Sequence, residues 1–160
     1  MKRIIFLSLI FCSAVVFGQN DVPRIDLQTL DGKTFNSQDM SSESAVTIVS
    51  LWATWCVPCL KELDAISEVY EDWQAETNVK LYAVSVDDSR TLKRVRPLVN
   101  GKGWDYTILL DTNHDFKRAV GAATVPMTLL VKDNKIVYRH SGYSPGAEFA
   151  LFEKIKEFSN

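Results

Sequence analysis

The chain has 160 residues, 46% of them hydrophobic and 24% charged, and its formal net charge is −2. This length is typical of one globular domain that buries its own core without metals or a dense set of disulfides. The charge balance excludes a protein dominated by a basic surface, so we expect no nucleic-acid or anionic-lipid partner.

The N-terminal segment predicts export. Lys2 and Arg3 precede a run of 14 largely apolar residues, IIFLSLIFCSAVVF, and Gly18 follows it. A basic start, a short apolar stretch and a small residue at its end are features of a secretory signal peptide. We therefore expect residues 1–18 to be removed and residues 19–160 to form a single domain. An uncleaved anchor is the alternative, although a bilayer span needs about 20 apolar residues.

Export decides which cysteines matter. Cys12 lies within the predicted signal, and the bulky Phe11 before it argues against lipid attachment, because bacterial lipoproteins resemble one another in having a small residue there. Cleavage removes two of the 18 basic residues and brings the net charge to −4. Only Cys56 and Cys59 then remain, in a compartment outside the reducing cytosol.

The first half of this domain predicts a hairpin, a strand and a helix. Within 25–35, Asp31-Gly32 separates two short runs and tolerates the positive φ of a tight hairpin turn. The run AVTIVSLW at 45–52 is apolar and rich in β-branched residues, as in a strand covered on both faces. From Pro58 to Trp73, apolar residues recur every three or four positions, which predicts one amphipathic helix.

The middle of the chain predicts two further strands, at 79–87 and 106–111, joined by a helix. We expect Ser89 to cap this helix, and the helix to stop or bend near Pro97 and Gly101.

The C-terminal part predicts a short helix at 116–120, two strands on either side of Asp133-Asn134, and a closing helix opened by Ser144-Pro145. The predicted apolar positions of the closing helix are Phe149, Phe152, Ile155 and Phe158. Strands that alternate with helices predict an α/β fold with a central mixed sheet and helices on both faces.

Cys56 and Cys59 directly follow the first buried strand, and three roles are open to them. As a staple, a disulfide that closes so short a loop contributes only about 2 kcal/mol in the chain-entropy account. A structural zinc needs four ligands, and the other soft candidates, His114 and His140, are isolated in sequence. We therefore expect no metal, and we expect structural or solvent-exposed roles for both histidines.

The third role, a redox switch, fits the placement of the pair. Cys56 lies at the start of the predicted helix, where free N–H groups and the helix dipole favour a thiolate. Cys59 lies one turn further in, where the helix shields it, so it can attack only a sulfur bound to Cys56. Pro58 falls in the first helical turn, where a missing N–H costs little.

Four stretches together resemble the thioredoxin superfamily, and more narrowly the exported TlpA/ResA-like thiol–disulfide oxidoreductases. They are WATWCVPC after a buried strand, ATVPMTLLV about 70 residues later, the DGK hairpin, and RHSGYSPGAEF before the last helix. The resemblance covers residues 21–158 and implies a thioredoxin-like fold with an extra N-terminal β-hairpin. It implies no cofactor.

The resemblance also implies a substrate-binding surface. Pro126 would be a cis-proline that faces the disulfide and exposes the backbone of Val125 to an extended substrate segment. Trp55 would line this surface, although a plain core aromatic is the alternative reading, and Trp52 is expected in the core. Together we expect Trp55, Val57, Pro58, Val125 and Pro126 to bind substrate.

Glu62 is the candidate base. It follows Cys59 by three residues, so the two side chains project from nearby faces of the helix. The resemblance places a glutamate here, whereas cytosolic thioredoxins resemble this chain but carry a buried aspartate where this sequence has Ser50. We expect Glu62 to take the proton of Cys59; an exposed surface glutamate is the alternative. Relatives often have a proline shortly afterwards, but here Leu63-Asp64 predicts an uninterrupted helix.

The sequence as a whole predicts an exported, monomeric thiol–disulfide oxidoreductase that most simply acts as a reductant. Its partners would be exported proteins with disulfides or thiols, such as apocytochrome c, and a membrane electron donor that re-reduces it. Two alternatives remain open: a thiol peroxidase on the same fold, and a non-enzymatic chaperone for a metal or heme ligand. The direction of electron flow depends on a reduction potential that the sequence does not fix.

Overall fold

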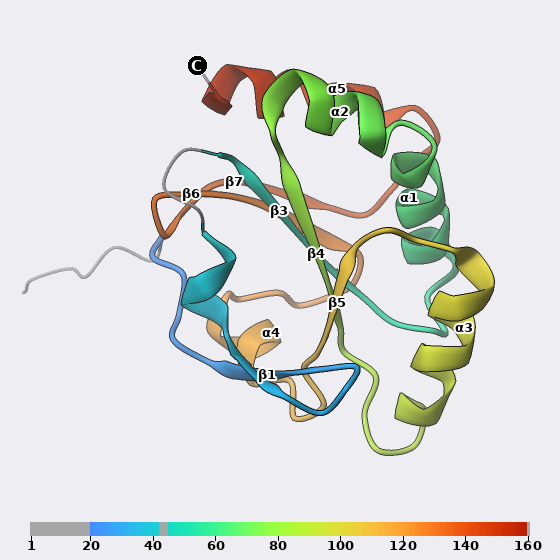
Figure 1. Ribbon diagram of the computed structural model, residues 1–160. Coiled ribbons are helices and arrows are strands. Elements are labelled where there is room, and N and C mark those ends of the chain that lie inside the picture. The colour runs from blue at the N-terminus through green and yellow to red at the C-terminus, as the bar shows by residue number, and fades with distance from the viewer. Residues whose placement is uncertain (1–19, 42–44, 160) are drawn as a thin grey trace, which may run out of the picture.

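A computed structural model describes residues 20–41 and 45–159, and its centre is one mixed sheet (Figure 1). Seven strands lie in the order β2-β1-β5-β4-β3-β6-β7. The three central strands β3, β4 and β5 are parallel, while β6 runs antiparallel to β3 and β7 antiparallel to β6. Their bounds are β3 Thr47–Trp52, β4 Lys80–Ser85, β5 Thr107–Leu110, β6 Met127–Lys132 and β7 Lys135–Ser141. The predicted mixed sheet is confirmed.

The predicted N-terminal hairpin is also present, as β1 (Asp26–Thr29) and β2 (Thr34–Asn36). Gly32 adopts a φ of 78° in its turn, and its N–H donates to the Thr29 carbonyl at 3.0 Å. Because β1 pairs antiparallel with β5, the hairpin extends the sheet by two strands at one edge.

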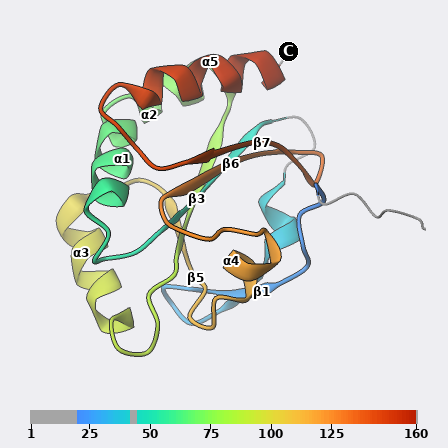
Figure 2. The same ribbon diagram turned by 180° about the vertical axis from the view of Figure 1, so that it is seen from behind.

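The helices cover both faces of the sheet, as predicted. Figures 1 and 2 show α1, α2, α3 and α5 on one face and α4 on the other. Both parallel crossovers, β3 to β4 and β4 to β5, step the same way along the sheet, and right-handed connections therefore place their helices on the same face. The bounds are α1 Val57–Ser67, α2 Tyr70–Thr77, α3 Val95–Lys102, α4 Asp115–Ala119 and α5 Ala147–Ser159, with short 3-10 helices η1 Ser37–Met40 and η2 Leu92–Arg94.

Strand β3 is the centre of the core. Every residue of β3 is buried, as expected for a central strand covered on both faces. Trp52, at its end, packs edge to face against Trp104 with the ring centroids 5.3 Å apart. The prediction that Trp52 belongs to the core is therefore confirmed, and the chain leaves this rigid strand directly into the two cysteines.

The single helix predicted from Pro58 to Trp73 is wrong in one respect, because it is broken into α1 and α2. Side-chain hydroxyl groups bind carbonyls of the last turn of α1. Tyr106 donates to the Leu63 carbonyl at 2.9 Å, and Ser67 donates to the Asp64 carbonyl at 2.7 Å. The Glu68 N–H still donates to the Asp64 carbonyl, whereas the Val69 N–H donates to the Ile66 carbonyl in a tighter turn. The helix breaks at this turn, although no proline or glycine signals it.

The predicted cap at Ser89 is wrong as well. The N–H groups of Thr91 and Leu92 both donate to the Asp88 carbonyl, and this turn leads into η2 rather than directly into an α-helix. Pro97 falls in the first turn of α3, where its missing N–H has no helical partner to lose. Helix α3 ends at Lys102, close to the predicted stop near Gly101, and Gly103, whose φ is 66°, is its C-cap residue.

The closing helix begins at Ala147, two residues after the predicted Ser144-Pro145 start. Gly146, at a φ of 94°, separates them, and its N–H donates to the Glu148 carboxylate at 3.0 Å. The helix buries Leu151 and Ile155, whereas Phe149 is 65% exposed. The predicted apolar face is thus wrong at Phe149.

The predicted signal at 1–18 lies outside the described residues. Within the described part of the chain, no helix has the length and apolar character needed to cross a membrane.

Candidate active site

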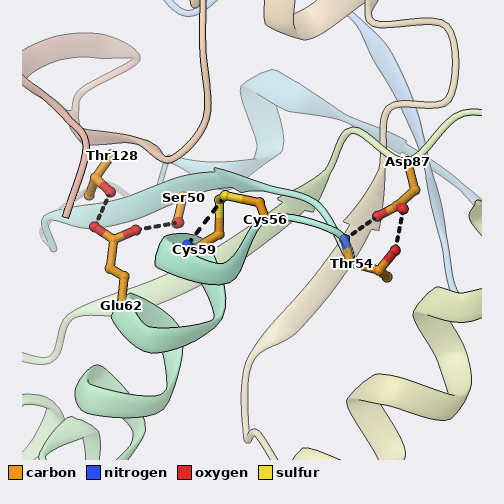
Figure 3. The surroundings of a disulfide bond; sticks show 7 residues. All are labelled: Ser50, Thr54, Cys56, Cys59, Glu62, Asp87 and Thr128. Carbon is orange, nitrogen blue, oxygen red and sulfur yellow. Dashed lines mark hydrogen bonds between the residues drawn. A yellow bond between two sulfur atoms is a disulfide. The ribbon is translucent and has the colours of Figure 1, made fainter.

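Cys56 and Cys59 form a disulfide at the start of α1, with an S–S distance of 2.03 Å and Cα atoms 5.3 Å apart. Cys56 is the N-cap residue, and its Sγ accepts a hydrogen bond from the Cys59 N–H at 3.3 Å (Figure 3). Pro58 lies in the first helical turn, as predicted. An N–H group directed at the Cys56 sulfur would stabilise a thiolate there once the disulfide is reduced.

The two sulfur-bearing residues differ in access to solvent. Cys59 is fully buried, while Cys56 retains 5% of its surface. The accessible part of Cys56 is small. The order of access is nevertheless the predicted one, since an incoming sulfur can reach only Cys56.

The residues that flank Cys56 are unusually exposed for their type. Trp55 is 57% exposed and Val57 is 60% exposed, and Pro58 is also on the surface. The alternative reading of Trp55 as a core aromatic is therefore wrong. Apolar side chains held in solvent beside a reactive group are candidates for contact with another molecule.

The Val125-Pro126 peptide bond is cis, as the resemblance implied. Pro126 is buried and Val125 is partly exposed. Leu51 of β3 pairs with Met127 at the start of β6. The cis bond therefore precedes β6 at the same end of the sheet at which β3 leads into the cysteines.

Glu62 is buried, with 3% of its surface exposed, so the alternative of a surface glutamate is wrong. Its carboxylate accepts hydrogen bonds from Thr128 Oγ1 at 2.7 Å and from Ser50 Oγ at 3.3 Å (Figure 3). Burial raises the pKa of the Glu62 carboxyl to about 7, and the two hydroxyl groups partly oppose that rise. A carboxyl group in this range can accept and release a proton near neutral pH.

Ser50 and Thr128 are site residues that the sequence did not identify as partners of Glu62. They are direct partners in the β3–β6 register, so both side chains point to the face that α1 covers. The sequence held only part of the signal, because Ser50 and Thr128 are polar residues flanked on both sides by apolar residues of their strands.

A second buried carboxylate, Asp87, holds the loop before Cys56 and was not predicted. Asp87 has no exposed surface. It accepts hydrogen bonds from the Thr54 N–H at 2.8 Å and from Thr54 Oγ1 at 2.6 Å (Figure 3). It also accepts one from Ser85 Oγ at 2.8 Å. Its one sequence signal was an acid as the last residue of the predicted strand 79–87. Asp87 fixes the chain two residues before Cys56.

We expect Asp87→Ala to destabilise the folded protein by about 1–3 kcal/mol, because it leaves the Thr54 N–H without its acceptor. The measurement is the urea midpoint of the oxidised protein. Asp88→Ala is the matched control, because Asp88 is the next residue and pairs with an exposed arginine, Arg90. Equal shifts in the two variants would contradict the assignment of the loop contact to Asp87.

The described residues contain no group of three or more His, Cys, Asp or Glu side chains that could hold a metal ion.

A disulfide at a helix start and a cis-proline at the same end of a mixed sheet of this topology define a thioredoxin-like protein. Residues 19–140 match the family model described as the AhpC/TSA family, and the chain belongs to that family. A solved thioredoxin-like protein of Porphyromonas gingivalis is 43% identical, with a TM-score of 0.75, over 86% of this chain and 91% of that one.

The curated relatives described next are named as thiol-disulfide oxidoreductases. The thiol-disulfide oxidoreductase ResA of Bacillus anthracis is 26% identical over 118 residues, which is 73% of this chain and 65% of the relative. The sporulation thiol-disulfide oxidoreductase A of Bacillus subtilis is 27% identical over 118 residues, 72% of this chain and 68% of the relative. The matched region thus spans about two thirds of these relatives, and the predicted resemblance to ResA-like proteins is confirmed.

Proposed function

We propose that the protein is an exported thiol–disulfide oxidoreductase that reduces disulfides in exported proteins, such as apocytochrome c. The observation that carries this proposal is the asymmetric pair at the start of α1, with Cys56 reachable, Cys59 buried, and a titratable carboxyl group, Glu62, buried behind them. The names of the curated relatives support the same reaction class.

The reaction exchanges one disulfide for another. The Cys56 thiolate attacks a substrate disulfide, forms a mixed disulfide and releases one substrate thiolate. Cys59 gives its proton to Glu62 and attacks the Cys56 sulfur, so the second substrate thiolate leaves and the Cys56–Cys59 disulfide forms. The substrate gains two electrons and the protein loses two. A dithiol donor at the membrane would return the protein to its reduced state.

The exposed residues around Cys56 suit a protein substrate. An extended segment would hydrogen-bond with the backbone of Val125, beside Pro126, as an added strand. Trp55, Val57 and Pro58 would pack against its side chains. Recognition of this kind depends mainly on backbone atoms and tolerates many sequences, which is appropriate for an enzyme with several exported substrates.

The remaining parts of the proposal concern location and assembly. The basic and apolar residues at 1–18 support a signal that directs residues 19–160 outside the cytosol as one monomeric domain. The membrane electron donor would then meet the protein in that compartment.

The direction of electron flow is tested by the midpoint potential of the Cys56/Cys59 couple, measured against glutathione redox buffers. We expect a value near that of thioredoxin, about −270 mV, because the proposal is a reductase. A value near about −120 mV, as in a strong oxidant, would contradict reduction as the physiological direction. Rapid consumption of hydrogen peroxide by the reduced protein would favour the peroxidase alternative instead.

A further inference from the structure

A small cavity lies behind Glu62, on the side of α1 that meets α5 and the β6–β7 hairpin. Its volume is about 50 Å³. The polar residues on its wall are Glu62, Thr128, Tyr138, His140 and Glu148, and Ile66 and Leu151 are among its apolar lining.

The wall of the cavity changes from buried to accessible along its length. Glu62 and Thr128 are buried, whereas His140 and Glu148 are partly exposed. Thr128 and His140 are direct partners in the β6–β7 register, so their side chains project to the same face. Thr128 donates to Glu62 at 2.7 Å. His140 is therefore directly opposite, on the neighbouring strand, a residue that binds the buried carboxylate.

The cavity is large enough for water. A volume of about 50 Å³ exceeds the roughly 10–15 Å³ of such space that one water molecule needs. Buried water needs two to four polar partners, and the wall of the cavity includes the polar residues Glu62, His140 and Glu148. Two carboxylates and an imidazole around one small cavity are more than packing alone requires.

We propose that Glu62 exchanges its proton with solvent through water in this cavity and that His140 relays the proton. This inference rests on the proposed function for its biological role. The Cys59 thiol loses its proton to the Glu62 carboxylate, and the carboxyl then gives that proton to cavity water. The water passes a proton to one ring nitrogen of His140, and the other ring nitrogen releases a proton to solvent. No electron moves in these steps.

Other titratable groups face the same region and are part of any pH profile. Glu148 lies on the cavity wall and accepts hydrogen bonds from the Tyr143 hydroxyl at 2.9 Å and from the Gly146 N–H. Burial, with the hydrogen bond to Glu148 as a lesser cause, raises the pKa of Tyr143 to about 12, so this hydroxyl remains a donor at neutral pH. Tyr138 lines the cavity, Tyr106 interacts electrostatically with Glu62, and Cys59 lies on the same helix as Glu62 (Figure 3).

The relay is tested first on the oxidised protein, without any substrate. A rapid pH jump is followed by infrared spectroscopy of the protonated carboxyl band of Glu62, identified as the band that Glu62→Gln removes. We expect His140→Gln to slow the relaxation of this band about tenfold. This effect is smaller than the rate loss expected when a direct base is removed, because water can still carry protons. His114→Asn is the control: it also replaces an imidazole with an amide, at a histidine bonded to the Val86 carbonyl and outside the cavity wall.

A second measurement connects the relay to turnover. Steady-state reduction of insulin disulfides should fall by a similar factor in His140→Gln, and free imidazole should restore part of the rate in His140→Ala. Wild-type relaxation of the infrared band in both histidine variants, or equal slowing in both, would overturn the relay. Slower relaxation in His140→Gln alone would uphold it even if the wild-type protein reduced no disulfide, an outcome that would refute only the proposed function.

Discussion

Replacing Cys56 with serine should lower disulfide reduction to the rate of the uncatalysed reaction. Cys56 is the residue of the pair with remaining access to solvent, and a serine hydroxyl in the same place is a far weaker nucleophile than a thiolate. The measurement is insulin reduction by the protein in the presence of a dithiol donor. Retention of substantial activity by Cys56→Ser would contradict the assignment of attack to this residue.

The matched variant is Cys59→Ala, which keeps the attacking sulfur and removes the resolving one. Because Cys59 is fully buried behind Cys56, its loss should stop the reaction at the mixed disulfide. Intact-mass spectrometry after addition of oxidised glutathione should show one glutathione bound at Cys56. When Cys59→Ala is expressed with its predicted signal and purified, its substrates should remain attached to Cys56 as mixed disulfides. Rapid turnover by Cys59→Ala would mean that a second external thiol resolves the intermediate.

Much of this architecture could be predicted, because the relevant signals are local. A continuous apolar run identified β3, and the Cys-x-x-Cys pair directly after it identified the start of α1. Asp31-Gly32 and Asp133-Asn134 marked both hairpins because their turns need positive φ, which Gly32 and both residues of the second turn adopt. Each of these features depends on neighbouring residues alone.

The features that could not be predicted depend on residues brought together by the fold. The bond from Thr128 to Glu62 joins positions 66 residues apart, and Asp87 reaches Thr54 over 33 residues. The break between α1 and α2 follows no proline or glycine, and Tyr106 binds the Leu63 carbonyl near it from another element. Spacing within one helix placed Glu62 near Cys59, but only sheet register shows what surrounds the carboxylate.

We expect the stability of the oxidised protein to fall as pH rises, and Glu62→Gln to remove most of this effect. Burial raises the folded-state pKa of Glu62 from 4.5 to about 7. An acid whose pKa is higher in the folded state than in the unfolded state stabilises the folded state fully at pH values below its unfolded-state pKa. This stabilisation is lost as pH rises through its folded-state pKa. The shift corresponds to about 3 kcal/mol of unfolding free energy between pH 4 and pH 8. Urea unfolding at both pH values tests this, with the exposed Glu68→Gln as control.

The same variant should be slower although it is no less stable at pH 8. Glutamine fills the space of Glu62 and can still hydrogen-bond with Ser50 and Thr128, but it cannot accept the Cys59 proton. General-base loss of this kind reduces rates by about a hundredfold or more, so resolution of the mixed disulfide should slow by at least that lower figure. A purely structural glutamate would instead lose rate and stability together. If Glu62→Gln is more stable at pH 8 but slower, Glu62 is a catalytic carboxylate and not a packing residue. In that case the buried charge destabilises the fold and serves the reaction.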